Sequence, residues 1–162
     1  MGPYRRHSAR VLLVDRAGRL LLLRFRFAPT GPARGHGWVT PGGGVEGDEP
    51  LAHAAAREVR EEIGLVVDPD RLGRPVAYRV GADDRGPTSG LFRDDFFLHR
   101  LDRHDVDVGG MESHERVTHA GHRWWTLDEL ASTRDVVYPL GLSTLLADVL
   151  DGRVPTPARR LP

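Results

Sequence analysis

Residues 43 to 65 read GGVEGDEPLAHAAAREVREEIGL, and this stretch decides the fold. A glycine turn leads into a predicted helix. Asp48 or Glu49 suits the N-cap or first turn, where an acidic side chain also meets the positive end of the helix dipole. Pro50 suits the first helical position because its missing N–H costs nothing there, and Gly64 suits a left-handed cap. We therefore expect one helix that begins at Pro50 and ends before Gly64.

The predicted helix has an apolar face and an acidic edge. At about 100° per residue, the apolar face consists of Ala52, Ala55, Ala56, Val59 and Ile63. The small alanines would let this face approach a sheet closely. Glu58, Glu61 and Glu62 fall together along one edge of the face, whereas Arg57 and Arg60 lie elsewhere on the wheel. The helix is thus expected to pack by one side and to present carboxylates along the adjoining side.

The acidic edge favours a metal site. Glu58 and Glu62 are like charges at i,i+4, which costs roughly a few tenths of a kcal/mol unless a cation lies between them. Magnesium prefers oxygen ligands, and it is usually held by a few carboxylates together with substrate phosphates. The alternative is a solvated charged surface on which Arg57 pairs with Glu61. That alternative does not explain the glycine turn before the predicted helix.

A zinc site is the weaker interpretation. The sequence contains no cysteine, so it offers no soft ligand, no disulfide and no thiol nucleophile. His114, His119 and His122 are the remaining candidates, but their spacing matches no strong zinc pattern. We expect these histidines in loops and at strand edges.

The motif G-x5-E-x7-R-E-(apolar)-x-E-E-x-G-(apolar) over residues 43–65 resembles the Nudix box, and every defined position is filled. The glycine turn Pro41-Gly42-Gly43-Gly44 directly precedes the helix, where glycine lets the backbone approach a metal or a phosphate. The resemblance implies an α+β Nudix fold, an α/β/α sandwich with a mixed β-sheet. It also implies a MutT-like hydrolase that cleaves a pyrophosphate bond in a nucleoside diphosphate linked to another moiety, by metal-assisted attack of water on phosphorus.

The resemblance assigns metal ligands as well. Glu58 and Glu62 look like direct ligands of Mg²⁺, for which Mn²⁺ is a substitute. Glu61 is either a third ligand or the group that orients water. The carbonyl of Gly42 is an additional candidate contact. The bound ion would neutralise phosphate oxygens and lower the pKa of a water molecule.

Two further roles follow from the resemblance. Arg57 looks like the family arginine that pairs with Glu49 and holds the helix in register behind the metal ligands. In much of the family the general base lies on a later loop, where Glu112 and Glu115 are the candidates, and Glu115 is preferred. The hypothesis is that Glu61 and Glu115 share the activation of water.

Substrate contacts are less well defined by the sequence. Trp38 is a candidate to stack on a base, although an aromatic side chain here better suits a core or fold-supporting role, and Arg24 and Arg26 are candidates to contact phosphates. The Pro-Gly-Gly-Gly run differs from the Pro-Lys-Gly typical of enzymes acting on diadenosine polyphosphates. We therefore favour a nucleoside triphosphate or a nucleotide-sugar-like diphosphate.

Rival functions are a nucleotide-sensing module that does not cleave its ligand and an isoprenyl diphosphate isomerase. The intact box disfavours the sensing module. The isomerase requires a cysteine, which this chain lacks.

Length and charge limit the remaining possibilities. The 162 residues are expected to form a single domain, and 23 basic residues, all arginine, balance 23 acidic ones. Balanced charge gives no electrostatic footprint for a nucleic-acid polymer or an anionic membrane. With no long apolar segment near the N-terminus, we expect a soluble, cytoplasmic protein whose partner is a small-molecule nucleoside diphosphate derivative. The family resemblance also allows a homodimer.

Outside the box, the patterns predict a short list of elements. A hairpin is expected from strands 9–14 and 19–25, and a helix at 142–150 from apolar residues at i, i+3, i+4, i+7 and i+8. Further expectations are extended segments at 38–40, 65–67, 75–80, 92–101 and 123–126, a brief helix starting at 127, a long loop at 102–119 and a loosely ordered tail at 153–162.

Overall fold

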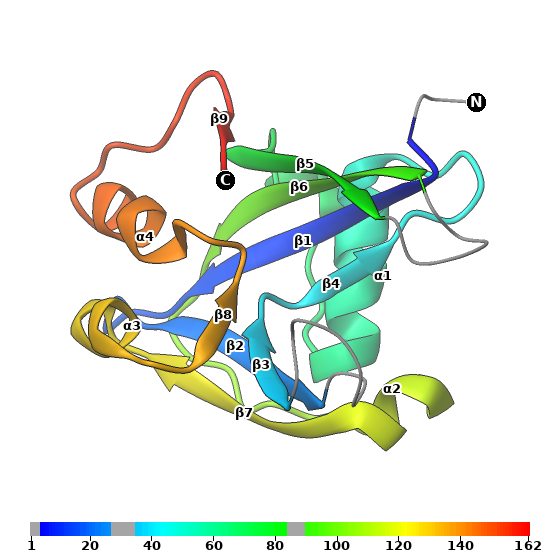
Figure 1. Ribbon diagram of the computed structural model, residues 1–162, viewed down its shortest axis with the longest axis horizontal. Helices are drawn as coiled ribbons and strands as arrows, with labels where there is room; N and C mark the ends of the chain where they lie inside the picture. Colours follow the sequence, from blue (N-terminus) through cyan, green and yellow to red (C-terminus); the bar gives the residue numbers. More distant parts are fainter. Residues whose placement is uncertain (1–3, 27–34, 84–89) are drawn as a thin grey trace.

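The computed structural model describes residues 4–26, 35–83 and 90–162, and its elements surround one curled sheet (Figure 1). The strands are β1 (Arg6–Val14), β2 (Leu20–Arg26), β3 (His36–Val39), β4 (Gly42–Gly44), β5 (Ala77–Asp83), β6 (Gly90–Arg100), β7 (His119–Trp125), β8 (Val136–Tyr138) and β9 (Arg159–Arg160). The helices are α1 (Leu51–Ile63), the 3-10 helix η1 (Pro69–Arg71), α2 (Ser113–Thr118), α3 (Leu127–Ser132) and α4 (Leu142–Leu150). No helix in these ranges is long and apolar enough to cross a membrane.

The sheet is mixed and it divides in the middle. Its order is β8-β3-β2-β1-β6-β5-β9, with β4 added to β1 and β7 added to β2. β1 meets β2 at Val14 and Leu20, but its residues 8–10 pair with β4 instead. Residues 23–26 of β2 likewise pair with β3. β3 and β4 therefore occupy the opening where β1 and β2 diverge, and Thr40 and Pro41 join them.

Each face of the sheet has its own apolar core, because side chains alternate between the faces along each strand. Val11 and Leu13 of β1 belong to a cluster with the buried residues of α1. Leu12 and Val14 belong to a second cluster with residues of α3 and α4. α1 thus covers one face and α3 and α4 cover the other, which confirms the α/β/α sandwich with a mixed sheet.

The helix of the box forms as expected, with one correction at its start. Gly64 ends α1 in the left-handed conformation, with φ of 69°. Pro50 is the N-cap in extended conformation rather than the first helical residue, and no side chain caps the helix. The Glu49 carboxylate instead accepts hydrogen bonds from the Glu46 N–H at 2.9 Å and from Arg57 at 2.7 Å. An ion pair therefore replaces the expected cap.

Several other expectations are confirmed and others need correction. The 9–14 and 19–25 hairpin and the 142–150 helix are present as β1, β2 and α4. The segment 102–119 is not all loop, because α2 forms within it. The segment 65–67 is not a strand, and β8 was not foreseen. The expected loose tail at 153–162 instead ends as β9, which pairs in parallel with β5 and buries Leu161 in the core.

Candidate active site

Two glycines of the turn bring the sheet against the acidic edge of α1. A Cβ on Gly43 would lie 2.6 Å from Glu58 Oε2, so any other residue there would displace this carboxylate. Gly42 has φ of 128°, and a Cβ on it would lie 2.3 Å from the Ala9 carbonyl oxygen. Glycine is therefore required at position 42 for β4 to lie beside β1, and at position 43 it leaves room for the Glu58 carboxylate.

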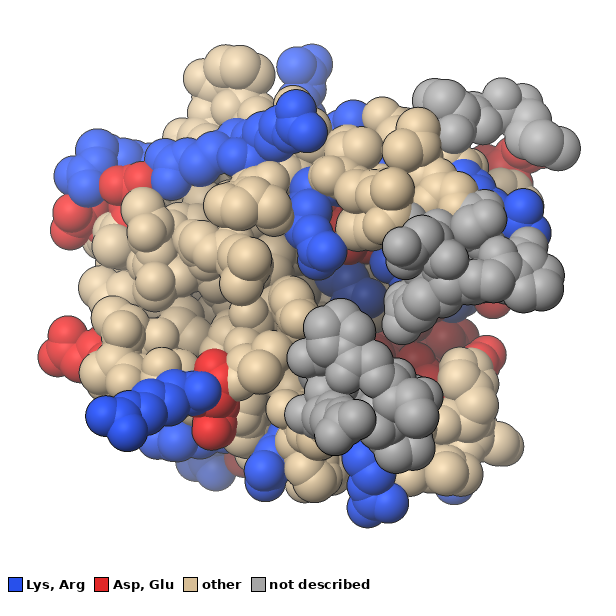
Figure 2. Space-filling model, viewed as in Figure 1, with Lys and Arg blue, Asp and Glu red and all other residues tan. Residues whose placement is uncertain are grey.

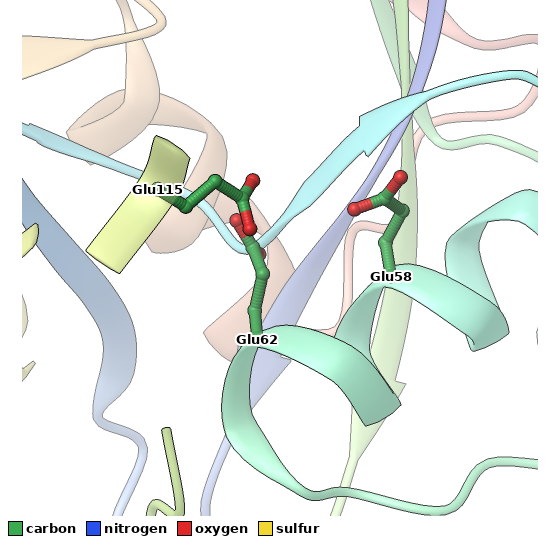
Figure 3. Close-up of side chains that lie close together, drawn as sticks. All are labelled: Glu58, Glu62 and Glu115. Atoms are coloured by element: carbon green, nitrogen blue, oxygen red, sulfur yellow. The ribbon is translucent and has the colours of Figure 1, made fainter. Parts of the chain in front are cut away.

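Three glutamates converge at this place. Glu58 and Glu62 come from successive turns of α1, and Glu115 reaches them from α2 (Figure 3). One carboxylate oxygen from each lies within 4.8 Å of the others. Glu58 and Glu62 are buried, at 8% and 3% exposed, whereas Glu115 is half-buried. Residues that are distant in the sequence thus form one oxygen-lined site.

The environment of the two buried carboxylates disfavours their negative charge. Burial raises the pKa of Glu62 to about 8, although the Gly42 N–H donates to its Oε2 at 2.7 Å and Arg10 lies nearby. Burial also raises the pKa of Glu58, and the hydrogen bond from Arg57 opposes that shift. Glu115 adds like charge to both. A divalent cation would offset both the burial and the repulsion, and it prefers this set of oxygen ligands.

Arg57 joins the metal-site helix to the loop before it. Its guanidinium donates to Glu49 at 2.7 Å, to Glu58 at 2.8 Å and to the Gly44 carbonyl at 2.8 Å. The helical wheel placed Arg57 apart from the glutamates, and this is corrected because the long side chain reaches back to them. These contacts hold the pKa of Glu49 below its usual value, with the Arg57 hydrogen bond as the largest cause.

Glu61 lies outside the glutamate cluster. Its Oε2 accepts a hydrogen bond from Arg57 at 3.3 Å, and about a third of its side chain is exposed, at 30%. The structure therefore brings Glu115, rather than Glu61, to Glu58 and Glu62. Glu58 and Glu61 are three residues apart, so their side chains point in neighbouring but different directions around the helix axis. Only tertiary contacts decide which of these directions faces the sheet.

Gly42 meets the site through its amide. Its N–H donates to Glu62, while its carbonyl accepts from Arg10 Nη1 at 3.0 Å. The same Arg10 nitrogen donates to the Thr40 carbonyl at 3.0 Å. The carbonyl that the sequence assigned to a metal is thus held by an arginine. Arg10 was not among the predicted site residues, although an arginine inside the apolar strand β1 is a signal visible in the sequence.

A docked loop delivers Glu115. The Ile63 carbonyl at the end of α1 accepts from the Asp107 N–H at 3.1 Å and lies 2.7 Å from His104 Nε2. Met111 is buried in the core beside α1, and it is followed by Glu112, the N-cap of α2. Glu115 belongs to a capping box with Glu112, whose N–H donates to its Oε2 at 3.3 Å. Glu112 is exposed, so the structure brings only Glu115 to the cluster.

The proposed substrate contacts lie on the other face of the sheet. Trp38 is only 8% exposed, and its indole N–H donates to Asp135 Oδ2 at 3.0 Å. The Arg24 guanidinium lies over the Trp38 ring at 5.7 Å. Arg26 is exposed at the end of β2. None of them belongs to the glutamate cluster, and the buried Trp38 forms part of the core.

Among the described residues, the group of acidic or histidine side chains with metal-ligand spacing consists of Glu58, Glu62 and Glu115. His119 packs its ring edge against Phe25 at 5.6 Å, and burial lowers its pKa.

Comparisons with known proteins identify the family and the fold. The family model of the NUDIX domain matches residues 4–141, most of the chain. The solved structure of a MutT protein from Methanosarcina mazei Go1 is similar with a TM-score of 0.65 and 21% identity, covering 91% of this chain and 94% of that one. The E. coli dihydroneopterin triphosphate pyrophosphohydrolase has a TM-score of 0.65 and 17% identity, covering 90% and 95%. At these identities the structures show a shared fold.

One curated relative is more similar over a shorter region. The RNA pyrophosphohydrolase of Acidiphilium cryptum is 44% identical over 62 residues, which are 38% of this chain. The chain spans only 36% of the length of that relative.

Proposed function

Because this chain belongs to the Nudix family, we propose that it is a metal-dependent hydrolase that cleaves a pyrophosphate bond in a nucleoside-diphosphate-linked substrate. The observation that carries the proposal is the cluster of Glu58, Glu62 and Glu115, whose carboxylate oxygens lie within 4.8 Å of one another. Glu58 and Glu62 are buried, and no single arginine among the described residues pairs with both carboxylates. Such an arrangement is costly for folding and is useful for holding a cation.

The donor set fits magnesium. Glu58 and Glu62 would hold the ion, and it is the hard, all-oxygen character of the cluster that favours Mg²⁺, with Mn²⁺ as a substitute. When bound, the ion supplies charge neutralisation at phosphate oxygens and a more acidic water. The Gly42 N–H holds one oxygen of Glu62, so the orientation of this ligand is fixed before the ion arrives.

The remaining residues have distinct proposed roles. Glu115 is half-buried and comes from a separate element, so it is placed to accept a proton from the attacking water. Arg57 holds Glu58 and Glu49 together and so fixes the register of α1 against the glycine turn. Glu61 would support this network through its contact with Arg57, and it shares water activation only if that contact opens.

The substrate class includes a second candidate. The curated relative that is 44% identical over 62 residues is an RNA pyrophosphohydrolase, which favours the 5′-pyrophosphate end of an RNA as one substrate to test. The formal net charge of zero favours small nucleotides instead. We keep the small nucleoside diphosphate derivative as the principal proposal.

A hydrolysis screen tests the function. The substrates are nucleoside triphosphates, ADP-ribose, nucleotide sugars, dinucleoside polyphosphates and 5′-triphosphorylated RNA, each with Mg²⁺ and with chelator. The variant is Glu62→Gln, and the matched control is Glu129→Gln, because glutamine preserves the capping box of α3. Metal-dependent turnover that is lost only in Glu62→Gln supports the proposal. Saturable nucleotide binding without turnover would support the sensing module instead.

A further inference from the structure

Two consecutive aspartates of β6 differ in how their carboxylates are satisfied. Asp95 is 1% exposed and fully engaged, with Arg93 donating to both of its oxygens at 2.8 Å and His7 Nε2 at 2.6 Å. Asp94 is 4% exposed, yet its Oδ1 has no hydrogen-bond partner among the described residues. The nearest cations are Arg6 at 3.8 Å and Arg10 at 3.9 Å, beyond hydrogen-bond distance. A buried carboxylate oxygen left unpaired is costly, so Asp95 has a structural explanation and Asp94 lacks one.

The unpaired oxygen belongs to a polar set on the face opposite α1. Residues two positions apart on a strand point to the same face. Asp94, Arg10 and Arg24 therefore share a face with Phe96, Leu12 and Leu22, which lie in the core cluster under α4. Two other buried polar atoms in this region, Arg24 Nε and Thr40 Oγ1, also lack a partner in the described part of the chain. Figure 2 shows arginine side chains in and around a recess on this face, with acidic side chains set back beside them.

The polar set is continuous with the glutamate cluster. Arg10 lies 3.9 Å from Asp94 Oδ1 and donates to the Gly42 carbonyl, while the Gly42 N–H donates to Glu62. One residue, Gly42, therefore links the polar set to the glutamate cluster. This series of contacts passes through β4 and β1, with α1 behind β4 (Figure 1). A nucleotide whose phosphates lie at the glutamates, and whose nucleoside part follows these contacts, would bring its base to Asp94.

We propose that Asp94 determines the base specificity of the substrate, with Asp94 Oδ1 accepting a ring N–H and Arg24 Nε donating to the adjacent carbonyl of the base. This inference rests on the proposed function for the placement of the phosphates. Guanine and uracil carry a ring N–H next to a carbonyl on their pairing edge, whereas adenine and cytosine carry an acceptor nitrogen there. A carboxylate accepts but cannot donate, so it binds the first pair and repels the second. Keto-base nucleotides are therefore the preferred substrates.

Asp94→Asn provides the test, because an amide can turn its N–H toward an acceptor nitrogen. We expect kcat/KM for GTP and UTP to fall roughly ten- to hundredfold, as for loss of a hydrogen bond to a charged group, while ATP and CTP hold or gain. ITP should behave like GTP, since it retains the ring N–H. The control is Asp105→Asn, the same chemical change at a side chain that is 85% exposed. A fall by the same factor for all bases would overturn the proposal.

Two additions keep the test decisive if Asp94→Asn folds poorly or the protein does not hydrolyse nucleotides. Arg24→Met removes the proposed donor to the base carbonyl and should reduce the GTP-to-ATP preference in the same direction; an unchanged ratio would count against the proposal. Binding of GDP, UDP, ADP and CDP by calorimetry with Mg²⁺ measures recognition without turnover. A keto-base preference in binding that Asp94→Asn abolishes sustains the inference even if hydrolysis is absent, whereas equal binding of all four contradicts it even if hydrolysis is present.

Discussion

Helices α1 and α4 cover opposite faces of the same sheet, and they differ in what they bury. The buried residues of α4 are all apolar: Leu142, Leu145, Leu146 and Val149. α1 buries alanines, Val59 and Ile63, but it also buries the carboxyl groups of Glu58 and Glu62. Apolar burial explains α4 completely as a contribution to stability. Burial of two acidic groups on α1 reduces stability. The proposed metal site would explain why α1 nevertheless buries them.

The largest expected effect is on catalysis, from the acidic residues of α1. Replacing Glu58 or Glu62 with glutamine should lower kcat/KM by at least about a hundredfold, since a metal ligand matters at least as much as the groups that orient it. The metal-free variant should melt at the same or a higher temperature than the parent above pH 8, because glutamine carries no buried charge. A loss of activity that merely followed a loss of folded protein would contradict the comparison.

The corresponding substitution in α4 should affect only stability. Leu145 is fully buried, so Leu145→Ala should lower the free energy of unfolding by about 2–5 kcal/mol through lost burial and a cavity. Chemical denaturation measures this change. The kcat of the molecules that remain folded should match the parent, and a selective fall in kcat would show that α4 also serves the site.

The pH dependence of stability should separate the two helices further. Burial raises the pKa of Glu62 in the folded protein to about 8 from its ordinary value of 4.5, so between these values the folded protein holds a proton that the unfolded chain has lost. This contribution is complete below pH 4.5 and is lost as the pH rises through about 8. Thermal melts of the metal-free protein should therefore shift downward over this window. The shift should be reduced in Glu62→Gln and retained in Leu145→Ala.

A smaller effect is expected from the ion network beside the cluster. Arg57→Met removes the contacts to Glu49, Glu58 and the Gly44 carbonyl and should weaken metal binding roughly tenfold, as for other residues that orient metal ligands. Isothermal titration calorimetry with Mn²⁺ measures the dissociation constant of the metal. Arg60→Met, an exposed arginine of the same helix, is the control, and equal weakening in both would indicate a general charge effect.

The smallest effect should come from Glu61. Since its carboxylate contacts Arg57 and lies outside the cluster, Glu61→Gln should lower kcat by less than about tenfold. Glu115→Gln should lower kcat more, with the metal dissociation constant changed less than kcat. If Glu61→Gln proves as damaging as Glu115→Gln, Glu61 shares the activation of water and must leave Arg57 during the reaction.

The local pattern of the sequence determined the family, α1, its left-handed end at Gly64 and the positions of Glu58 and Glu62 on it. These features depend on residues one or two helical turns apart, so the helical repeat specifies them. The same holds for the β1–β2 hairpin and for α4, whose repeats are strong.

Only the tertiary structure decided which carboxylates meet. Glu115 joins Glu58 and Glu62 because a loop docks on the end of α1 through Asp107 and Met111, and no local period encodes that contact. The pairing of Arg10 with the Gly42 carbonyl and the lack of a hydrogen bond to Asp94 Oδ1 among the described residues likewise depend on tertiary structure, where the sheet divides between β1 and β2. Contacts between distant segments are set by the summed packing of many side chains, and a single sequence does not reveal which packing has the lowest free energy.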